Sequence, residues 1–199
     1  PLDTGNYIIY SVKEINIDNP SNIYDTTEYQ LKELVESTFE DDDGNVIYRI
    51  ERYKRGSDSS LWQIEDIWQA ELTKERAEKT EENQRFIKIV FPVKLNEEWN
   101  GNAFNNLQEE NYEITDLDAN EVINNIEYDS VLTVTQANDS SLIDKYYKVE
   151  KYAKNIGLVY KYKINVVSDI QISDMSLPIE QRIDTGRIYE QKILNYSIK

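Results

Sequence analysis

Residues 145–167, KYYKVEKYAKNIGLVYKYKINVV, decide the fold class, because they contain two runs of alternating residues around one turn. In the second run one phase of the alternation is apolar or aromatic and the other is polar: Leu158, Tyr160, Tyr162, Ile164 and Val166 against Lys161, Lys163 and Asn165. A period of two predicts a strand with one buried face and one face in water. The turn Lys154-Asn155-Ile156-Gly157 then predicts an antiparallel hairpin.

The same alternation recurs along the rest of the chain, between turns rich in Asn, Asp and Gly. Further strands are predicted at residues 7–15, 29–39, 46–55, 61–72, 86–91, 112–117, 130–136 and 187–198. We therefore predict a mainly β protein with little helix, in which about nine or ten antiparallel strands form a meander that curls into a barrel or a strongly curved sheet. A two-sheet β-sandwich is the alternative.

The hairpin of residues 29–39 and 46–55 can be predicted at the level of register. A two-residue turn at Asp43-Gly44 would place Glu36 opposite Glu51, and the two carboxylates would repel each other. A four-residue loop instead gives four favourable pairs: Val35 with Ile50, Phe39 with Val46, Glu36 with Arg49 and Glu33 with Arg52. Each pair contributes about 0.2 to 1 kcal/mol, so we expect the four-residue loop.

Residues 73–84 fit two structures. The spacing of Glu and Lys resembles an exposed helix, but the segment has no apolar stripe with which a helix could dock on a core. We favour a polar hairpin.

Composition excludes several functions. The 199 residues include 38 acidic and 22 basic side chains, a net charge of −16, and neither histidine nor cysteine. Catalysis by a His- or Cys-based nucleophile, the usual zinc sites and thiol redox chemistry are therefore excluded. The negative charge argues against nucleic acid and against direct binding to anionic lipid headgroups. We expect residues 1–199 to form a single domain, which at this length buries about 70% of its unfolded surface.

Three parts of the chain together are similar to a known group of proteins. They are residues 5–12 (GNYIIYSV) with 25–31 (DTTEYQL), residues 85–92 (RFIKIVFP) with 99–104 (WNGNAF), and residues 152–161 (YAKNIGLVYK). In this order they resemble uncharacterised cell-envelope lipoproteins of gram-negative bacteria. The resemblance covers most of the chain and implies no activity. It implies a protein of the periplasm or the cell surface, anchored to the outer membrane by a lipidated cysteine upstream of Pro1.

Residues 116–127 are the best candidate for a metal site. Asp116, Asp118 and Asn120 stand at the first, third and fifth positions of a calcium-loop spacing, and Glu127 stands at the twelfth. Glu121 argues against calcium, because it occupies the position where a sharp turn needs Gly. A solvated acidic loop is the usual meaning of such spacing and is favoured over calcium, and no other cofactor is expected.

Trp62, Trp68, Trp99 and Tyr160 are the candidate ligand-binding residues. Their rings offer flat apolar surfaces to a sugar ring or walls to a lipid cavity. For the tryptophans packing in the core is the favoured interpretation, because large aromatic side chains are normally well buried. We predict no catalytic residue, since 38 acidic side chains supply many chance pairs of carboxylates, such as Glu51 with Asp66.

Two functional hypotheses follow. We expect the monomeric, non-catalytic ectodomain of an envelope lipoprotein, which binds or supports other envelope proteins and reaches the membrane only through its upstream anchor. The alternative is a lipocalin-like or lipoprotein-carrier-like protein whose curved sheet encloses an apolar small molecule. The two differ in whether Leu158, Tyr160 and Ile164 pack against one another or line a void. A carboxylate-based hydrolase ranks third.

Overall fold

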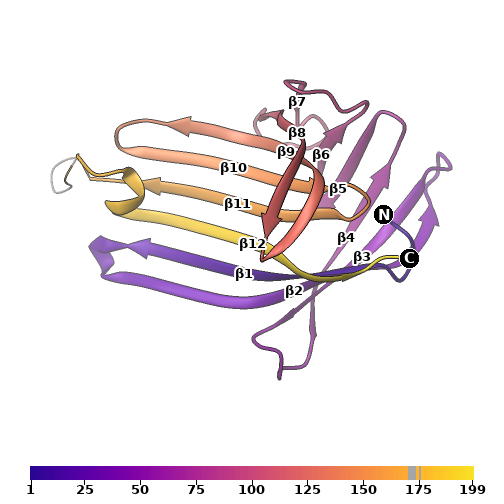
Figure 1. Cartoon of the computed structure of the whole chain (residues 1–199), viewed down its shortest axis with the longest axis horizontal. Coiled ribbons are helices and arrows are strands. Elements are labelled where there is room, and N and C mark those ends of the chain that lie inside the picture. Colours follow the sequence, from indigo (N-terminus) through magenta and orange to yellow (C-terminus); the bar gives the residue numbers. More distant parts are fainter. Residues whose placement is uncertain (170–173, 175) are drawn as a thin grey trace.

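The computed structural model describes residues 1–169, 174 and 176–199, and places twelve strands of these residues in one antiparallel sheet (Figure 1). The strands are β1 (Tyr7–Asp18), β2 (Ile23–Glu40), β3 (Val46–Arg55), β4 (Gln63–Leu72), β5 (Arg76–Glu81), β6 (Gln84–Val90), β7 (Glu98–Asn100), β8 (Asn111–Ile123), β9 (Ile126–Ser140), β10 (Asp144–Ala153), β11 (Gly157–Val167) and β12 (Thr185–Ser197). Two short 3₁₀ helices are η1 (Asn19–Ser21) and η2 (Ile179–Gln181). No helix in the described ranges is long and apolar enough to cross a membrane.

The sheet is a meander that nearly closes on itself. Its strand order is β6-β5-β4-β3-β2-β1-β12-β11-β10-β9-β8-β7, so only the β1–β12 pair joins strands that are not consecutive in the chain. The two edges meet where the N–H of Ile87 donates to the carbonyl of Gly101 at 2.9 Å and Trp99 Nε1 donates to the carbonyl of Ile87 at 2.9 Å. The predicted antiparallel, barrel-like meander is confirmed, with more strands than expected, and no second sheet lies among the described residues.

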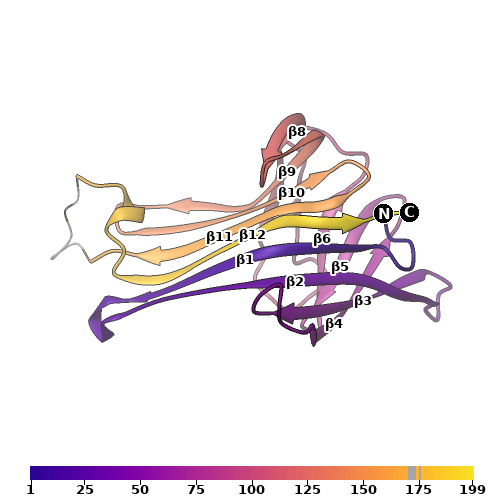
Figure 2. The same ribbon diagram turned by 60° about the horizontal axis from the view of Figure 1, so that its bottom comes forward.

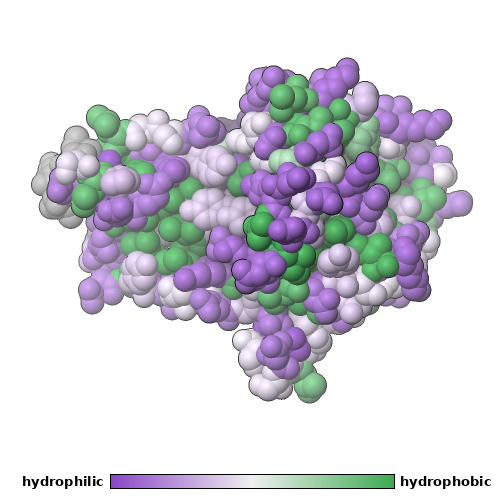
Figure 3. Space-filling view, in the orientation of Figure 1, coloured by the Kyte–Doolittle hydropathy of each residue, from purple (hydrophilic) through white to green (hydrophobic). Residues whose placement is uncertain are grey.

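The middle strands are longer than the barrel. β2 pairs with β3 only from Gln30 onward, and β8 pairs with β9 only as far as Thr135, so the remaining lengths of β2, β1, β12, β11, β10 and β9 extend as an open sheet away from the two termini (Figures 1 and 2). Hydrophilic residues cover much of the face seen in Figure 1, with apolar residues exposed between them (Figure 3).

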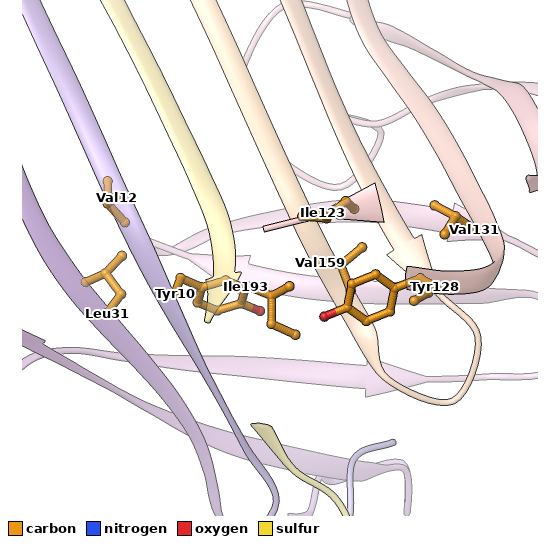
Figure 4. Packing of buried hydrophobic residues seen from close by; sticks show 9 residues of the cluster. Tyr10, Val12, Leu31, Ile123, Tyr128, Val131, Val159 and Ile193 are labelled. Carbon is orange, nitrogen blue, oxygen red and sulfur yellow. The ribbon is translucent and has the colours of Figure 1, made fainter. Parts of the chain in front are cut away.

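The far half of the β8–β9 hairpin folds over this sheet. It crosses β10, β11 and β12 in Figure 1, and Asn124 Nδ2 donates to the carbonyl of Ile193 at 3.2 Å. The largest cluster of buried apolar side chains among the described residues joins this hairpin to the sheet and includes residues of both: Tyr10, Val12, Leu31, Ile123, Tyr128, Val131, Ala153, Val159 and Ile193. Figure 4 shows Tyr10 beside Ile193 and Tyr128 beside Val159.

Turn residues account for two hairpins, β5–β6 and β8–β9, that the alternation of apolar and polar residues does not predict. Glu82 and Asn83 join β5 to β6 with φ of 49° and 60°, and Asn124 and Asn125 join β8 to β9 with φ of 52° and 64°. Two successive residues with positive φ are typical of the two-residue turn that matches the twist of paired strands. Residues 73–84 are not helical, as expected, but they form only the first arm and the turn of a hairpin, which β6 completes as far as Val90.

The predicted register of the β2–β3 hairpin is half right. Val35 pairs with Ile50 and Glu33 with Arg52, but Phe39 pairs with Ile47, because a bulge at Glu36 shifts the register by one residue. The connecting loop therefore spans residues 41–45 instead of four residues. The carboxylate of Asp41 organises it, accepting from the N–H groups of Asp43 at 3.0 Å and Asn45 at 2.8 Å.

Replacing Gly101 tests the closure of the sheet. A Cβ at this position would lie 2.4 Å from the ring of Tyr112, which is buried. We expect Gly101→Ala to lower the free energy of unfolding by about 1–3 kcal/mol through overpacking, measured by urea titration of tryptophan fluorescence. Gly56→Ala is the control, since a Cβ there would meet no atom within 4 Å. Equal stability of the two variants would contradict tight packing at this junction.

Candidate functional site

A cavity of about 1100 Å³ lies at the end of the barrel that carries both termini. Pro1, Asn6 and Lys199 are among its lining residues. Small-molecule sites commonly measure about 300–1,000 Å³, so this cavity is slightly larger than that range.

One part of the cavity wall is apolar. It is formed by side chains from β1, β2, β3, β6, β9 and β11: Ile8, Val35, Ile50, Ile89, Leu132 and Leu158. The two functional hypotheses differ in whether Leu158, Tyr160 and Ile164 pack together or line a void. Only Leu158 lines the cavity. Ile164 is fully buried away from it, and Tyr160 packs against the cluster beneath the β8–β9 hairpin.

The other part of the wall is charged. Glu33, Lys79, Glu81, Lys88 and Glu150 face the cavity and belong to a longer row of alternating charge. We call this set the charge row, in spatial order: Asp66, Arg52, Glu33, Lys79, Glu81, Lys88, Glu150 and Lys161.

Each glutamate of the charge row contacts two cations. Glu33 lies 3.4 Å from Arg52 and 2.8 Å from Lys79. Glu81 lies 4.0 Å from Lys79 and 3.1 Å from Lys88. Glu150, which is 1% exposed, lies 3.5 Å from Lys88 and 3.0 Å from Lys161.

The charge row joins walls that are not neighbours in the sheet. The Lys88–Glu150 contact links β6 to β10, and the Lys79–Glu33 contact links β5 to β2. At the other end Arg52 stacks on the ring of Trp68, with its guanidinium carbon 3.8 Å from the ring centre. The row therefore crosses the interior of the barrel.

The cations of the charge row determine the ionisation of its carboxylates. Burial by itself raises the pKa of Glu81, but Lys88, Lys161 and Lys79 outweigh it and lower that pKa from 4.5 to about 2. Burial likewise opposes ionisation of Glu150, yet Lys88, Lys161 and the hydroxyl of Tyr152 hold its pKa well below the usual range. Both carboxylates are therefore charged at neutral pH.

Lys161 was expected on a wet face of its strand, and this expectation is wrong. Its ammonium contacts the buried Glu150, so burial lowers its pKa less than Glu150 and Glu81 raise it, and the net shift is upward. The physical reason is the curvature of the sheet, which turns this face of β11 toward the interior near Lys161. Lys163 and Asn165, farther along the strand, are exposed as predicted.

The four predicted ligand-binding aromatic residues are not brought together, and none of them lines the cavity. Trp68 lies under Arg52, Trp99 makes an edge contact with Tyr112 at 6.0 Å, and Trp62 lies 4.4 Å from Arg55. Tyr160 donates to Glu190 at 3.1 Å. Binding of a ligand by these four residues stays a prediction.

The predicted calcium ligands lie on paired strands of the β8–β9 hairpin instead of a loop. Asp116, Asp118 and Asn120 belong to β8, and Glu127 belongs to β9, where it pairs with Val122. Within the described part of the chain no group of three or more acidic side chains is placed to hold a metal ion. Calcium binding stays a prediction.

The carboxylates of Glu51 and Asp66 do not converge. Asp66 contacts Arg52 at 3.2 Å, and Glu51 contacts Arg49 at 2.6 Å. Because Glu51 and Arg52 are consecutive in a strand, their side chains point to opposite faces. This pair cannot act on one substrate as acid and base.

Comparison with protein-family models, with curated proteins and with solved structures finds no match. The resemblance to envelope lipoproteins therefore stays a prediction, together with the location and the lipid anchor that it implies.

The charge row predicts acid lability. The pKa of Glu81 is lower in the folded chain than its ordinary value of 4.5, so its stabilising contribution is complete above about pH 4.5 and is lost as the pH falls toward about 2. We expect this one group to account for on the order of 3 kcal/mol of the free energy of unfolding over that range, measured by urea titration at several pH values.

Glu81→Gln should flatten this acid dependence. Glu28→Gln is the control, because Glu28 is 70% exposed in its pair with Lys13 and should leave the dependence unchanged. If the free energy of unfolding depends on pH equally in Glu81→Gln and in the wild type, Glu81 is not the source of the acid lability.

Proposed function

We propose that the protein binds an amphiphilic small molecule in the cavity. This proposal develops the alternative hypothesis from the sequence, a carrier, but with a ligand that has a polar end instead of a purely apolar one. The observation that carries the proposal is the junction, in one cavity, of an apolar wall with the charge row. An apolar chain can be buried against Ile50, Ile89 and Leu132, while a polar end meets the ions. Burial of apolar surface contributes roughly 25 cal/mol per Å², so a chain of modest length is enough for binding.

The ionisation of the cavity carboxylates supports binding over hydrolysis. A general acid or base works best with a pKa near the operating pH. Glu81 has a pKa of about 2, and the pKa of Glu150 is also strongly lowered. Carboxylates in this state are weak bases and do not supply protons at neutral pH.

The envelope role and the ligand proposal are compatible. A lipid-anchored ectodomain with a cavity for an amphiphile would hold its ligand close to the membrane surface. The anchor, the location and the monomeric state remain predictions from the sequence.

Native mass spectrometry of the protein purified without detergent tests the proposal. We expect adducts with the masses of amphiphilic molecules, and binding of the neutral apolar dye N-phenyl-1-naphthylamine after the adducts are extracted. Leu158→Arg places a charge in the apolar wall and should abolish both signals.

Leu61→Arg is the matched control, because Leu61 is 88% exposed and does not line the cavity. It should bind like the wild type. A bare protein mass together with no dye binding by the wild type would refute the proposed function.

A further inference from the structure

We propose that the ligand of the cavity has a polar end without net charge, with hydroxyl groups as its polar atoms. The proposal rests on the proposed function and specifies the class of amphiphile: a monoacylglycerol or a long-chain alcohol, and neither a fatty acid anion nor an alkylammonium ion. It follows from the ion pairs within the charge row, in which every charged side chain contacts at least one side chain of opposite charge.

The charge row has no net charge. Its four acidic and four basic members alternate, and each of its six inner members contacts an opposite charge on both sides. The sum is zero. Glu33 through Lys161, the part nearest the cavity, also contains three carboxylates and three ammonium groups.

An added anion finds no spare cation there. To bind a ligand carboxylate, Lys79 would have to move from Glu33 and Glu81, or Lys88 from Glu81 and Glu150. Either movement leaves a buried carboxylate with one partner in place of two. Removing one partner of a buried ion pair is strongly destabilising, because the remaining charge is not compensated.

A ligand cation would be repelled by the basic groups of the charge row. Glu33, Glu81 and Glu150 each already contact two basic groups, and a third would lie close to Lys79 or Lys88. Repulsion between like charges is stronger in a partly dry interior than in water.

A hydroxyl group suits the charge row, because it adds hydrogen bonds and no charge. A lysine ammonium has three donors and a carboxylate has about four lone-pair sites, more than two contacts each require. A ligand hydroxyl can therefore donate to Glu81 or Glu150 and accept from Lys88 while the ion pairs stay in place.

Other charged groups around the cavity do not alter this balance. Glu71 and Glu78 both pair with Arg85, and Glu78 also contacts Arg76. Asp118, Lys154 and Lys199 are exposed, so water and salt screen them.

Three ligands with the same alkyl chain length test the proposal: monolaurin, laurate and dodecylammonium. Each competes with N-phenyl-1-naphthylamine for the delipidated wild-type protein at pH 7 and low salt. We expect monolaurin to bind at least tenfold more tightly than either charged ligand. Laurate or dodecylammonium binding as tightly as monolaurin would overturn the proposal, and so would a bound dye that none of the three displaces. Absence of dye binding refutes the proposed function instead.

Two variants should shift the preference in opposite directions. Glu81→Gln leaves a surplus positive charge and should improve the affinity for laurate relative to monolaurin by about tenfold. Lys79→Gln leaves a surplus negative charge and should do the same for dodecylammonium. A general loss of packing cannot produce opposite changes, and circular dichroism establishes that each variant folds.

Glu110→Gln is the matched control. Glu110 forms an ion pair of similar burial with Lys148, at 2.6 Å, and lies outside the cavity lining. Its substitution should leave the order of the three ligands unchanged. Equal preferences in Glu81→Gln, Lys79→Gln and Glu110→Gln would show that the charge row does not select the ligand.

Discussion

The contact of Glu150 with Lys88 and Lys161 is the interaction on which the interior of the barrel depends. A carboxylate that is 1% exposed is stable in its charged form only when cations surround it. These cations come from β6 and β11, and β6 is far from β10 in the order of the sheet. Satisfying one buried charge therefore requires the sheet to curl until β6 faces β10. The hydrogen bonds between Ile87 and the β7 region join the edges that this curvature brings together.

The apolar core of the described residues is divided. In the part of the chain that the structure describes, buried apolar residues form three clusters, one between the β8–β9 hairpin and the sheet, one around Tyr112 and Val134, and one around Ile50 and Trp68. Long, thin lysine and glutamate side chains fill the interior less completely than branched aliphatic ones, and they leave the cavity beside them. Near one end of the row, the guanidinium of Arg52 stacks on the ring of Trp68.

Local patterns predicted most of the fold, whereas the site depends on contacts between distant strands. The alternation at 162–166 and the pairing of Glu33 with Arg52 concern neighbours in sequence or in one hairpin, so the sequence was sufficient there. A bulge at Val159 breaks the predicted alternation between Leu158 and Tyr160. The bulge at Glu36 was not predictable, because no residue there signals an extra unpaired position. The position of Lys88 could have been suspected, because it is the single charge within the apolar run FIKIVFP at 86–92. Lys79 and Glu81 lie in a polar segment whose alternation does not show which side chains point inward.

Burying a row of ions inside a barrel carries a large desolvation free energy. Replacing buried ion pairs with apolar residues of similar volume is often neutral or stabilising, so stability alone does not account for three glutamates and their cations in this interior. What apolar residues cannot provide is a polar surface inside an otherwise apolar cavity. A row that balances its own charges supplies donors and acceptors without a net field, and this combination distinguishes hydroxyl groups from ions. We propose that the arrangement that curls the sheet also selects the ligand of the cavity.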